Sequence, residues 1–165
     1  MANHLAEIIW ERGEQDFLSG RYSRKHLLRF DGGVEVAGSS SPHVVPLPWS
    51  DPAAVDPEEA FVASIASCHM LWFLSIAAGR GLCVDRYRDN AVGVMGKNAT
   101  GKLVILRVAL RPEVSFSGGP PPDLALLNQL HHEAHEECFI ANSVKTEITC
   151  EPVIPAEPGA QTAST

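Results

Sequence analysis

Positive charge is scarce in this sequence and nowhere concentrated. Thirteen Lys and Arg residues stand against twenty Asp and Glu residues, so the formal net charge at pH 7 is -7. The densest basic group is the scattered set Arg21, Arg24, Lys25 and Arg29. Because nucleic-acid binding needs a concentrated basic surface that neutralises phosphates, we expect no nucleic acid as a partner.

The sequence also lacks a secretory signal and an uninterrupted apolar run. Its first residues show no basic stretch followed by an apolar one, from which we expect a cytoplasmic location. The longest apolar segment, residues 60–78, contains Ser, Cys and His side chains, so we expect a buried core helix and no membrane association. In a reducing compartment, cysteines are more often thiols, ligands or redox groups than structural disulfides. The four cysteines are Cys68, Cys83, Cys138 and Cys150.

No internal repeat is visible, and the composition is that of an ordinary globular protein. Hydrophobic residues make up 45% and charged residues 20% of the 165 positions, which predicts one folded domain over residues 1–154. Residues 155–165 carry Pro, Gly, Ala and Thr without periodicity, and we expect them to be disordered. Five prolines between residues 38 and 57 predict a long loop.

Turn formers divide the remaining chain into short strands and two helices, which indicates an α+β fold. Asp56 as N-cap, Pro57 at the first helical position and two acidic residues after it predict the start of the first helix, which glycines 79 and 81 end. A second helix is predicted from Asp123 to Cys138. The predicted strands are residues 5–10, 26–30, 34–36, 83–87, 91–95, 102–116 and 145–153.

Cys68 lies midway along the predicted apolar helix and admits two interpretations. It is either a small core residue or a reactive thiol, and a reactive thiol needs a nearby cation and access for a substrate. The candidates for the cation are Arg24 and Arg21, which would otherwise be solvated loop arginines. Cys138 ends the second helix, and we rank the pair of Cys68 and Cys138 above the other pairings.

A competing group lies at the polar end of the second helix. His131, His135 and Cys138 follow one another at i, i+4 and i+7, so they share one helical stripe and could present imidazole and thiolate donors to Zn²⁺. Three ligands on one helix rarely complete a site, and a solvated polar helix end is the alternative. We predict no metal and no other cofactor, and keep a metal- or small-molecule-binding module as the alternative function.

Three short motifs of the chain belong together: Asp56-Pro57-Glu58-Glu59, Ala66-Ser67-Cys68 and Cys138-Phe139-Ile140-Ala141-Asn142. They resemble the motifs of the OsmC/Ohr family, the osmotically inducible and organic hydroperoxide resistance proteins, which are thiol-dependent hydroperoxide reductases. The order of strands and helices is also similar over residues 5–153. The family's second cysteine is commonly followed by Pro and, three positions after the cysteine, by Ser, where this chain has Phe139 and Ala141, which indicates a divergent branch.

The resemblance implies an OsmC-like fold, in which antiparallel sheets pack on a central buried helix in an intertwined homodimer. It also implies a peroxidatic Cys68, a resolving Cys138 and an activating pair of Glu58 with an Arg, for which we choose Arg24 over Arg21. The reaction would pass through a sulfenic acid on Cys68 to a Cys68–Cys138 disulfide, which a dithiol or lipoyl-type reductant reopens. The apolar wall predicted to favour organic hydroperoxides consists of Met70, Leu71, Trp72 and Phe73.

The spacing of Glu58 and Cys68 adds a geometric expectation. Ten residues of straight helix span about 15 Å, so Glu58 cannot reach the Cys68 of its own chain. Either the helix breaks, or the Glu58 and Arg pair serves the thiol of a second chain across a two-fold interface. We predict the second arrangement.

Overall fold

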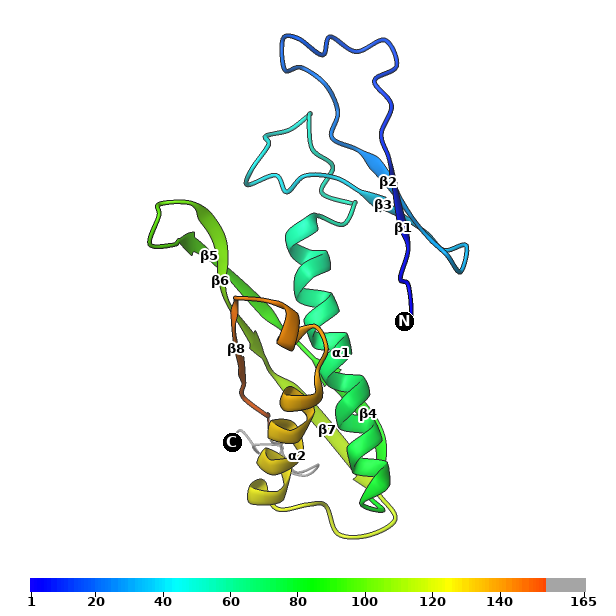
Figure 1. Cartoon of the computed structure of the whole chain (residues 1–165), viewed down its shortest axis with the longest axis vertical. Coiled ribbons are helices and arrows are strands. Elements are labelled where there is room, and N and C mark those ends of the chain that lie inside the picture. The colour runs from blue at the N-terminus through cyan, green and yellow to red at the C-terminus, as the bar shows by residue number, and fades with distance from the viewer. Residues whose placement is uncertain (154–165) are drawn as a thin grey trace, which may run out of the picture. The chain divides into compact units, whose positions relative to one another are not determined.

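The structure is a computed structural model, and it describes residues 1–153. The segment expected to be disordered, residues 155–165, lies outside the described residues. Strands and two long helices confirm the α+β class (Figure 1). Contacts between residues divide the chain into two compact units, one of residues 1–61 and one beginning at Val62. Each unit is described by itself below.

The first unit contains a three-stranded antiparallel sheet. Its strands are β1 (Ala6–Ile9), β2 (His26–Phe30) and β3 (Glu35–Gly38), and β2 pairs with both neighbours. A tight turn joins β2 to β3, with Gly33 at φ +82°, a conformation that side chains with a Cβ rarely adopt. All three strands agree with the sequence-based prediction to within two residues.

The proline-rich loop after β3 is held to this unit by hydrogen bonds. The fully buried Ser39 accepts a hydrogen bond from the Asp51 N–H at its hydroxyl, 3.0 Å away, and donates its own N–H to the Val55 carbonyl at 3.1 Å. The loop ends at the predicted helix cap. Asp56 Oδ1 accepts from the Glu59 N–H at 2.8 Å, and Glu59 Oε2 accepts from the Asp56 N–H at 3.1 Å. This reciprocal capping box explains why the helix begins here.

The long helix α1 (Pro57–Gly79) buries one stripe of its surface rather than every face. The buried residues recur at every fourth position, and they are Ile65, His69, Phe73 and Ala77. Leu71, by contrast, is 60% exposed. α1 is long and apolar enough to cross a membrane, but core helices of other proteins have the same length and composition. Within this chain, 22% of its most apolar segment is buried. The expectation of a helix buried on all sides is therefore wrong for a single chain.

The second unit adds five strands, a helix and a short 3₁₀ helix. Strands β4 (Cys83–Asp89) and β7 (Pro112–Ser117) form an antiparallel pair. Strands β5 (Val92–Lys97), β6 (Leu103–Leu110) and β8 (Glu147–Cys150) form a second sheet in the order β5-β6-β8. The helices are α2 (Leu124–Glu137) and η1 (Ala141–Ser143).

Two expectations about these strands are corrected. The predicted strand over residues 102–116 is two strands that belong to different sheets, because the chain leaves one sheet after Leu110 and enters the other at Pro112, which has no N–H to donate to a ladder. The sheets are also not wholly antiparallel, since β8 runs parallel to β6. A parallel return needs a crossover, and the chain makes it through β7 and α2.

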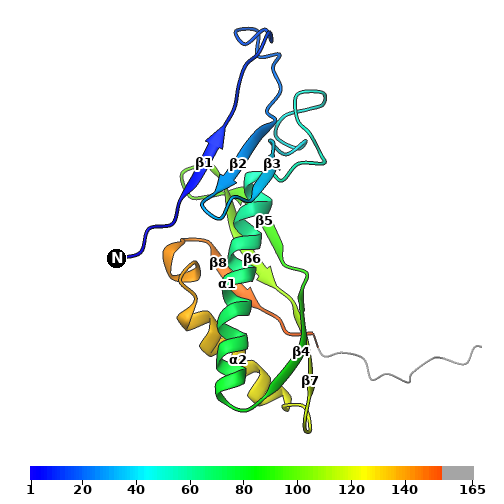
Figure 2. The same ribbon diagram turned by 90° about the vertical axis from the view of Figure 1, so that its right-hand side faces the viewer.

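The core of the second unit lies between α1, α2 and β7. Phe73 and Ala77 of α1 pack with Leu127, Leu130 and Ala134 of α2 and with Val114 of β7. Arg80, just after α1, forms a two-pronged ion pair with Glu133 of α2, whose longer contact is 2.7 Å. Figure 2 shows α2 alongside the C-terminal half of α1, and this pairing positions the side chains considered next.

Candidate functional site

Two of the four cysteines lie side by side in the second unit. Cys68 is half-buried on α1, and Cys138 is buried at the C-cap of α2. The two thiols are within hydrogen-bonding reach of each other. The Cys138 sulfur also accepts a hydrogen bond from the Ala141 N–H at 3.4 Å, and the Asn142 side chain donates to the Cys138 carbonyl at 3.1 Å. The residues after α2 therefore fix Cys138 against Cys68.

The surroundings of Cys138 keep it protonated near neutral pH. Burial and, to a smaller extent, the neighbouring Cys68 raise the pKa of the Cys138 thiol to about 11. Cys138 therefore enters any reaction as a thiol that can donate its proton. The Ala141 N–H acts in the opposite sense, because it stabilises a thiolate, but its effect is smaller.

A cavity of about 550 Å³ opens beside Cys68, and its walls are mainly apolar. Trp72 and Phe139 both line this cavity and contact each other edge to face, with ring centroids 5.5 Å apart. Of the predicted apolar wall, Leu71 and Trp72 line this cavity, whereas Met70 is half-buried and Phe73 is fully buried in the core. The lining residues are Ser64, Ser67, Cys68, Leu71, Trp72, Ser75, Phe139 and Ile140.

The predicted activating residues share a smaller cavity in the first unit. Arg24 and Glu58 both line a space of about 190 Å³, together with His26, Ser39, Ser40 and Pro57. The Arg24 guanidinium stacks on the Tyr22 ring with 3.8 Å to the ring centroid, and it donates to the carbonyls of Gly20 and Tyr22. Arg21 is exposed and is not among the residues that line this space. This placement favours Arg24 as the partner of Glu58.

Glu58 and Cys68 stand ten residues apart on α1, which has no break between Pro57 and Gly79. At about 1.5 Å of rise per residue, the two residues are separated by about 15 Å along the helix. The alternative of a broken helix, which would have let Glu58 approach the thiol of its own chain, does not occur.

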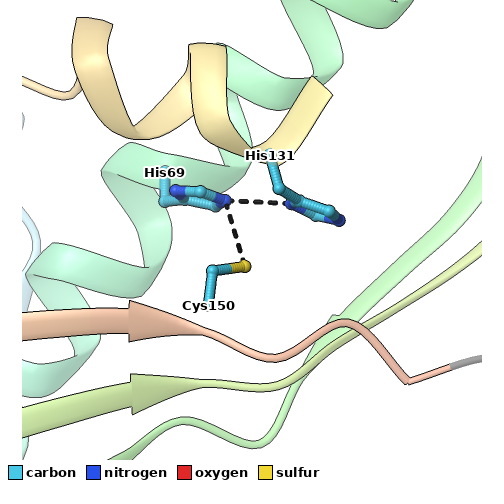
Figure 3. Close-up of side chains that lie close together, drawn as sticks. All are labelled: His69, His131 and Cys150. Carbon is cyan, nitrogen blue, oxygen red and sulfur yellow. Dashed lines mark hydrogen bonds between the residues drawn. The ribbon is translucent and has the colours of Figure 1, made fainter. Parts of the chain in front are cut away.

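A third group of polar side chains lies on a neighbouring face of α1, which carries His69, the residue directly after Cys68. His69 Nε2 lies 3.0 Å from His131 Nδ1 on α2 and 3.8 Å from Cys150 Sγ on β8 (Figure 3). Both histidines are almost fully buried. The predicted stripe of His131, His135 and Cys138 is thus divided, since His131 faces His69 and Cys150 while Cys138 lies beside Cys68.

All three members of this group are uncharged at neutral pH. Burial and, to a smaller extent, the nearby His135 lower the pKa of His69 to about 4. Burial likewise lowers the pKa of His131 to about 3, with a smaller contribution from His69. Burial, with smaller contributions from Asp89 and Glu151, raises the pKa of the Cys150 thiol to about 12. Cys150 is therefore a poor nucleophile by itself.

Sequence reasoning missed this group. It gave neither Cys150 nor His69 a functional role. A histidine within an otherwise apolar helix, directly after a candidate catalytic cysteine, was the available signal. Its partners are 62 and 81 residues away in the sequence, so that only the packing of α1, α2 and β8 shows them together.

Comparison with known proteins agrees with the geometry. Residues 50–153 match the family model described as OsmC-like protein. The chain is 53% identical to an OsmC-like protein of unknown function from Vibrio cholerae, with a TM-score of 0.90 over 93% of this chain and 100% of that one. The sequence matches none of the curated proteins.

More distant solved structures share the fold. An organic hydroperoxide resistance protein from Elizabethkingia anophelis, with thiocyanate bound, is 15% identical with a TM-score of 0.68, covering 93% of this chain and 96% of that one. The organic hydroperoxide resistance protein of Bacillus subtilis is 14% identical with a TM-score of 0.61, covering 93% and 98% of the two chains. At this level of identity the likeness establishes the fold alone.

Proposed function

Because the chain belongs to the family of OsmC-like proteins, we propose that it is a thiol-dependent peroxidase that reduces organic hydroperoxides. The observation that carries this proposal is the pair of Cys68 and Cys138 at the edge of an apolar cavity. Two proteins of the same fold are named organic hydroperoxide resistance proteins, which supports the substrate class.

The proposed reaction begins at Cys68. Its thiolate sulfur bonds to the terminal oxygen of the hydroperoxide while the O–O bond breaks, and the alkoxide that leaves takes up a proton to become an alcohol. Cys68 is then a sulfenic acid. The sulfur of Cys138 attacks the Cys68 sulfur, and water leaves as the disulfide forms. A dithiol or lipoyl-type reductant restores both thiols.

The cavity beside Cys68 suits an organic rather than an inorganic peroxide. Leu71, Trp72, Phe139 and Ile140 offer apolar contacts to the carbon part of a hydroperoxide, and hydrogen peroxide has no such part. The half-buried Cys68 gives the peroxide oxygen access to sulfur at the same place. In this proposal the peroxide group of the substrate lies at Cys68 and its carbon part lies in the cavity.

The working unit of this proposal is a homodimer. In this proposal Arg24 supplies the positive charge that a thiolate nucleophile needs, and Glu58, which lines the same cavity, attracts the guanidinium when the site is assembled. Since about 15 Å of helix separates Glu58 from Cys68, the Arg24 and Glu58 of one protomer serve Cys68 of its partner. A second protomer would also cover the exposed stripe of α1 around Leu71.

Intact mass spectrometry tests the chemistry. After one equivalent of an organic hydroperoxide, the reduced protein should lose the mass of two hydrogens, and the loss should map to a peptide pair containing Cys68 and Cys138. Cys83→Ser, which removes an exposed thiol, should behave like the wild type. Cys68→Ser should show no loss and no turnover with a dithiol. Full turnover in Cys68→Ser would refute the proposal.

A mixing experiment tests the shared site. Arg24→Met and Cys68→Ser should each be inactive alone. When the two variants are unfolded together and refolded, half of the dimers are mixed, and each mixed dimer holds one complete site, so about a quarter of the wild-type activity should return. Refolding each variant separately before mixing is the control for incomplete exchange. No recovery, with mixed dimers present by mass, would place Arg24 and Cys68 of one site on the same chain.

A further inference from the structure

We propose that His69, His131 and Cys150 form a binding site for a Zn²⁺ ion, separate from the cysteine pair that carries the peroxidase chemistry. Nitrogen and sulfur donors are the ligands that Zn²⁺ takes in proteins. The three ligand atoms all lie within 4.8 Å of one another. The site does not depend on the proposed peroxidase function, because neither Cys68 nor Cys138 belongs to it.

The distances fit a tetrahedral ion. With bonds of about 2.0 Å to nitrogen and about 2.3 Å to sulfur, tetrahedral angles place two nitrogens about 3.3 Å apart and a nitrogen and a sulfur about 3.6 Å apart. The structure has 3.0 Å between His69 Nε2 and His131 Nδ1, and 3.8 Å between His69 Nε2 and Cys150 Sγ. Both of these distances lie within a few tenths of an ångström of the tetrahedral values. The third, between His131 Nδ1 and Cys150 Sγ, is at most 4.8 Å, so a bound ion would draw these two side chains closer together.

Hydrogen bonding alone does not account for this convergence. Both contacts of Figure 3 meet at one atom, His69 Nε2, which carries either one proton or one lone pair. That atom can make one full-strength linear hydrogen bond, whereas it faces both His131 and Cys150. A cation at the centre removes the conflict, since each of the three atoms then directs a lone pair to the same point.

The polar atoms around the group are incompletely paired as well. Buried polar atoms normally have partners, and clusters of exceptions call for an ion or water. Three such atoms near the group have no hydrogen-bond partner among the described residues. They are Tyr87 Oη and the ring nitrogens that face away from the proposed ion, His69 Nδ1 and His131 Nε2.

Charge and access also suit a cation. Asp89 is close enough to Cys150 to influence it electrostatically, and its negative charge would stabilise a bound cation. A cavity of about 310 Å³ reaches His131 and Cys150 and gives an ion a path to them. His135 lines the same cavity one turn after His131, so the fourth coordination position is open to its imidazole or to water. On binding, Cys150 releases its proton to solvent and coordinates as the thiolate.

Cobalt substitution tests the site with a spectroscopic signal. The reduced full-length chain, freed of metal with a chelator, should bind one Co²⁺ per chain and show a near-ultraviolet thiolate-to-cobalt band that Zn²⁺ abolishes by displacement. Cys150→Ser should remove the band and weaken Zn²⁺ binding about 100-fold or more. Cys83→Ser is the matched control and should keep the band.

The outcomes separate this site from the catalytic pair. The double variant Cys68→Ser with Cys138→Ser should keep the band, and its loss there would place the metal at the catalytic cysteines and overturn the proposal. A band that persists in Cys150→Ser, or no Co²⁺ binding by the wild type, would also overturn it. X-ray absorption of the Zn²⁺-loaded wild type needs no variant to fold: one sulfur per zinc supports the site, and two or none contradict it.

Discussion

Cys68 and His69 are consecutive residues on α1, but their side chains lie in different environments. Cys68 is half-buried beside Cys138 at the edge of an apolar cavity, whereas His69 is almost fully buried against His131 and Cys150. One step along a helix turns a side chain by about a quarter of a turn or more, so a single helix can serve two polar groups without mixing them. A cysteine on one face of α1 is therefore accessible from a cavity, whereas the histidine that follows it is buried among other polar side chains.

The difference lies in access and in partners. On the Cys68 face the second thiol lies within hydrogen-bonding reach, and a mainly apolar cavity opens beside Cys68. On the His69 face the groups are neutral and enclosed, and Cys150 has its pKa raised to about 12 by burial. The accessible Cys68 face is therefore suited to a chemical reaction, whereas the largely buried His69 face is suited to packing or to binding a ligand.

The largest effect expected from this comparison is on stability. Phe73→Ala removes a fully buried ring from the core between α1 and α2, and it should lower the free energy of unfolding by about 3–5 kcal/mol. Leu71→Ala, on the exposed face, should cost less than about 1 kcal/mol at low protein concentration. Urea denaturation of both variants measures the difference. Equal losses would mean that the two faces of α1 are not distinct in the folded chain.

Local sequence signals were sufficient for most of the elements. Asp56 and Glu59 determine the start of α1 through their own hydrogen bonds, and Pro57 suits the first helical position because it needs no N–H partner there. The Asp123 side chain caps α2 by accepting from the Leu126 N–H at 2.8 Å. Such caps involve residues three positions apart, so the sequence displays them directly.

Features that depend on contacts between segments far apart in the sequence could not be predicted from local patterns. Apolar residues alternate through residues 102–116, and this pattern predicts a strand. It does not show which sheet the strand joins, and in the structure the chain passes from one sheet to another around Arg111. The parallel pairing of β8 with β6 likewise depends on the crossover through α2. The His69, His131 and Cys150 group requires both of these arrangements, which explains why its members were not grouped from the sequence.

The candidate catalytic site was predicted in part from the sequence. The motifs around Cys68 and Cys138 predicted a pair that the structure brings together, but the cavity wall was only partly anticipated. Helix periodicity turns Phe73 into the core while leaving Leu71 and Trp72 at the cavity. Phe139 and Ile140 reach the same cavity from the segment after α2, which no pattern on α1 can show.

The smallest expected effect concerns Phe139 and tests whether the cavity face selects its substrate. Phe139 is 69% exposed and contacts Trp72 across the cavity, so Phe139→Ala should lower kcat/KM for a hydroperoxide with a bulky apolar group about tenfold. Hydrogen peroxide makes no use of an apolar wall, and its kcat/KM should stay unchanged. Leu103→Ala, which removes a side chain of similar exposure outside the cavity, is the matched control. If both peroxides lost rate equally, Phe139 would position Cys138 rather than the substrate, and selection would depend on the other residues of the cavity wall.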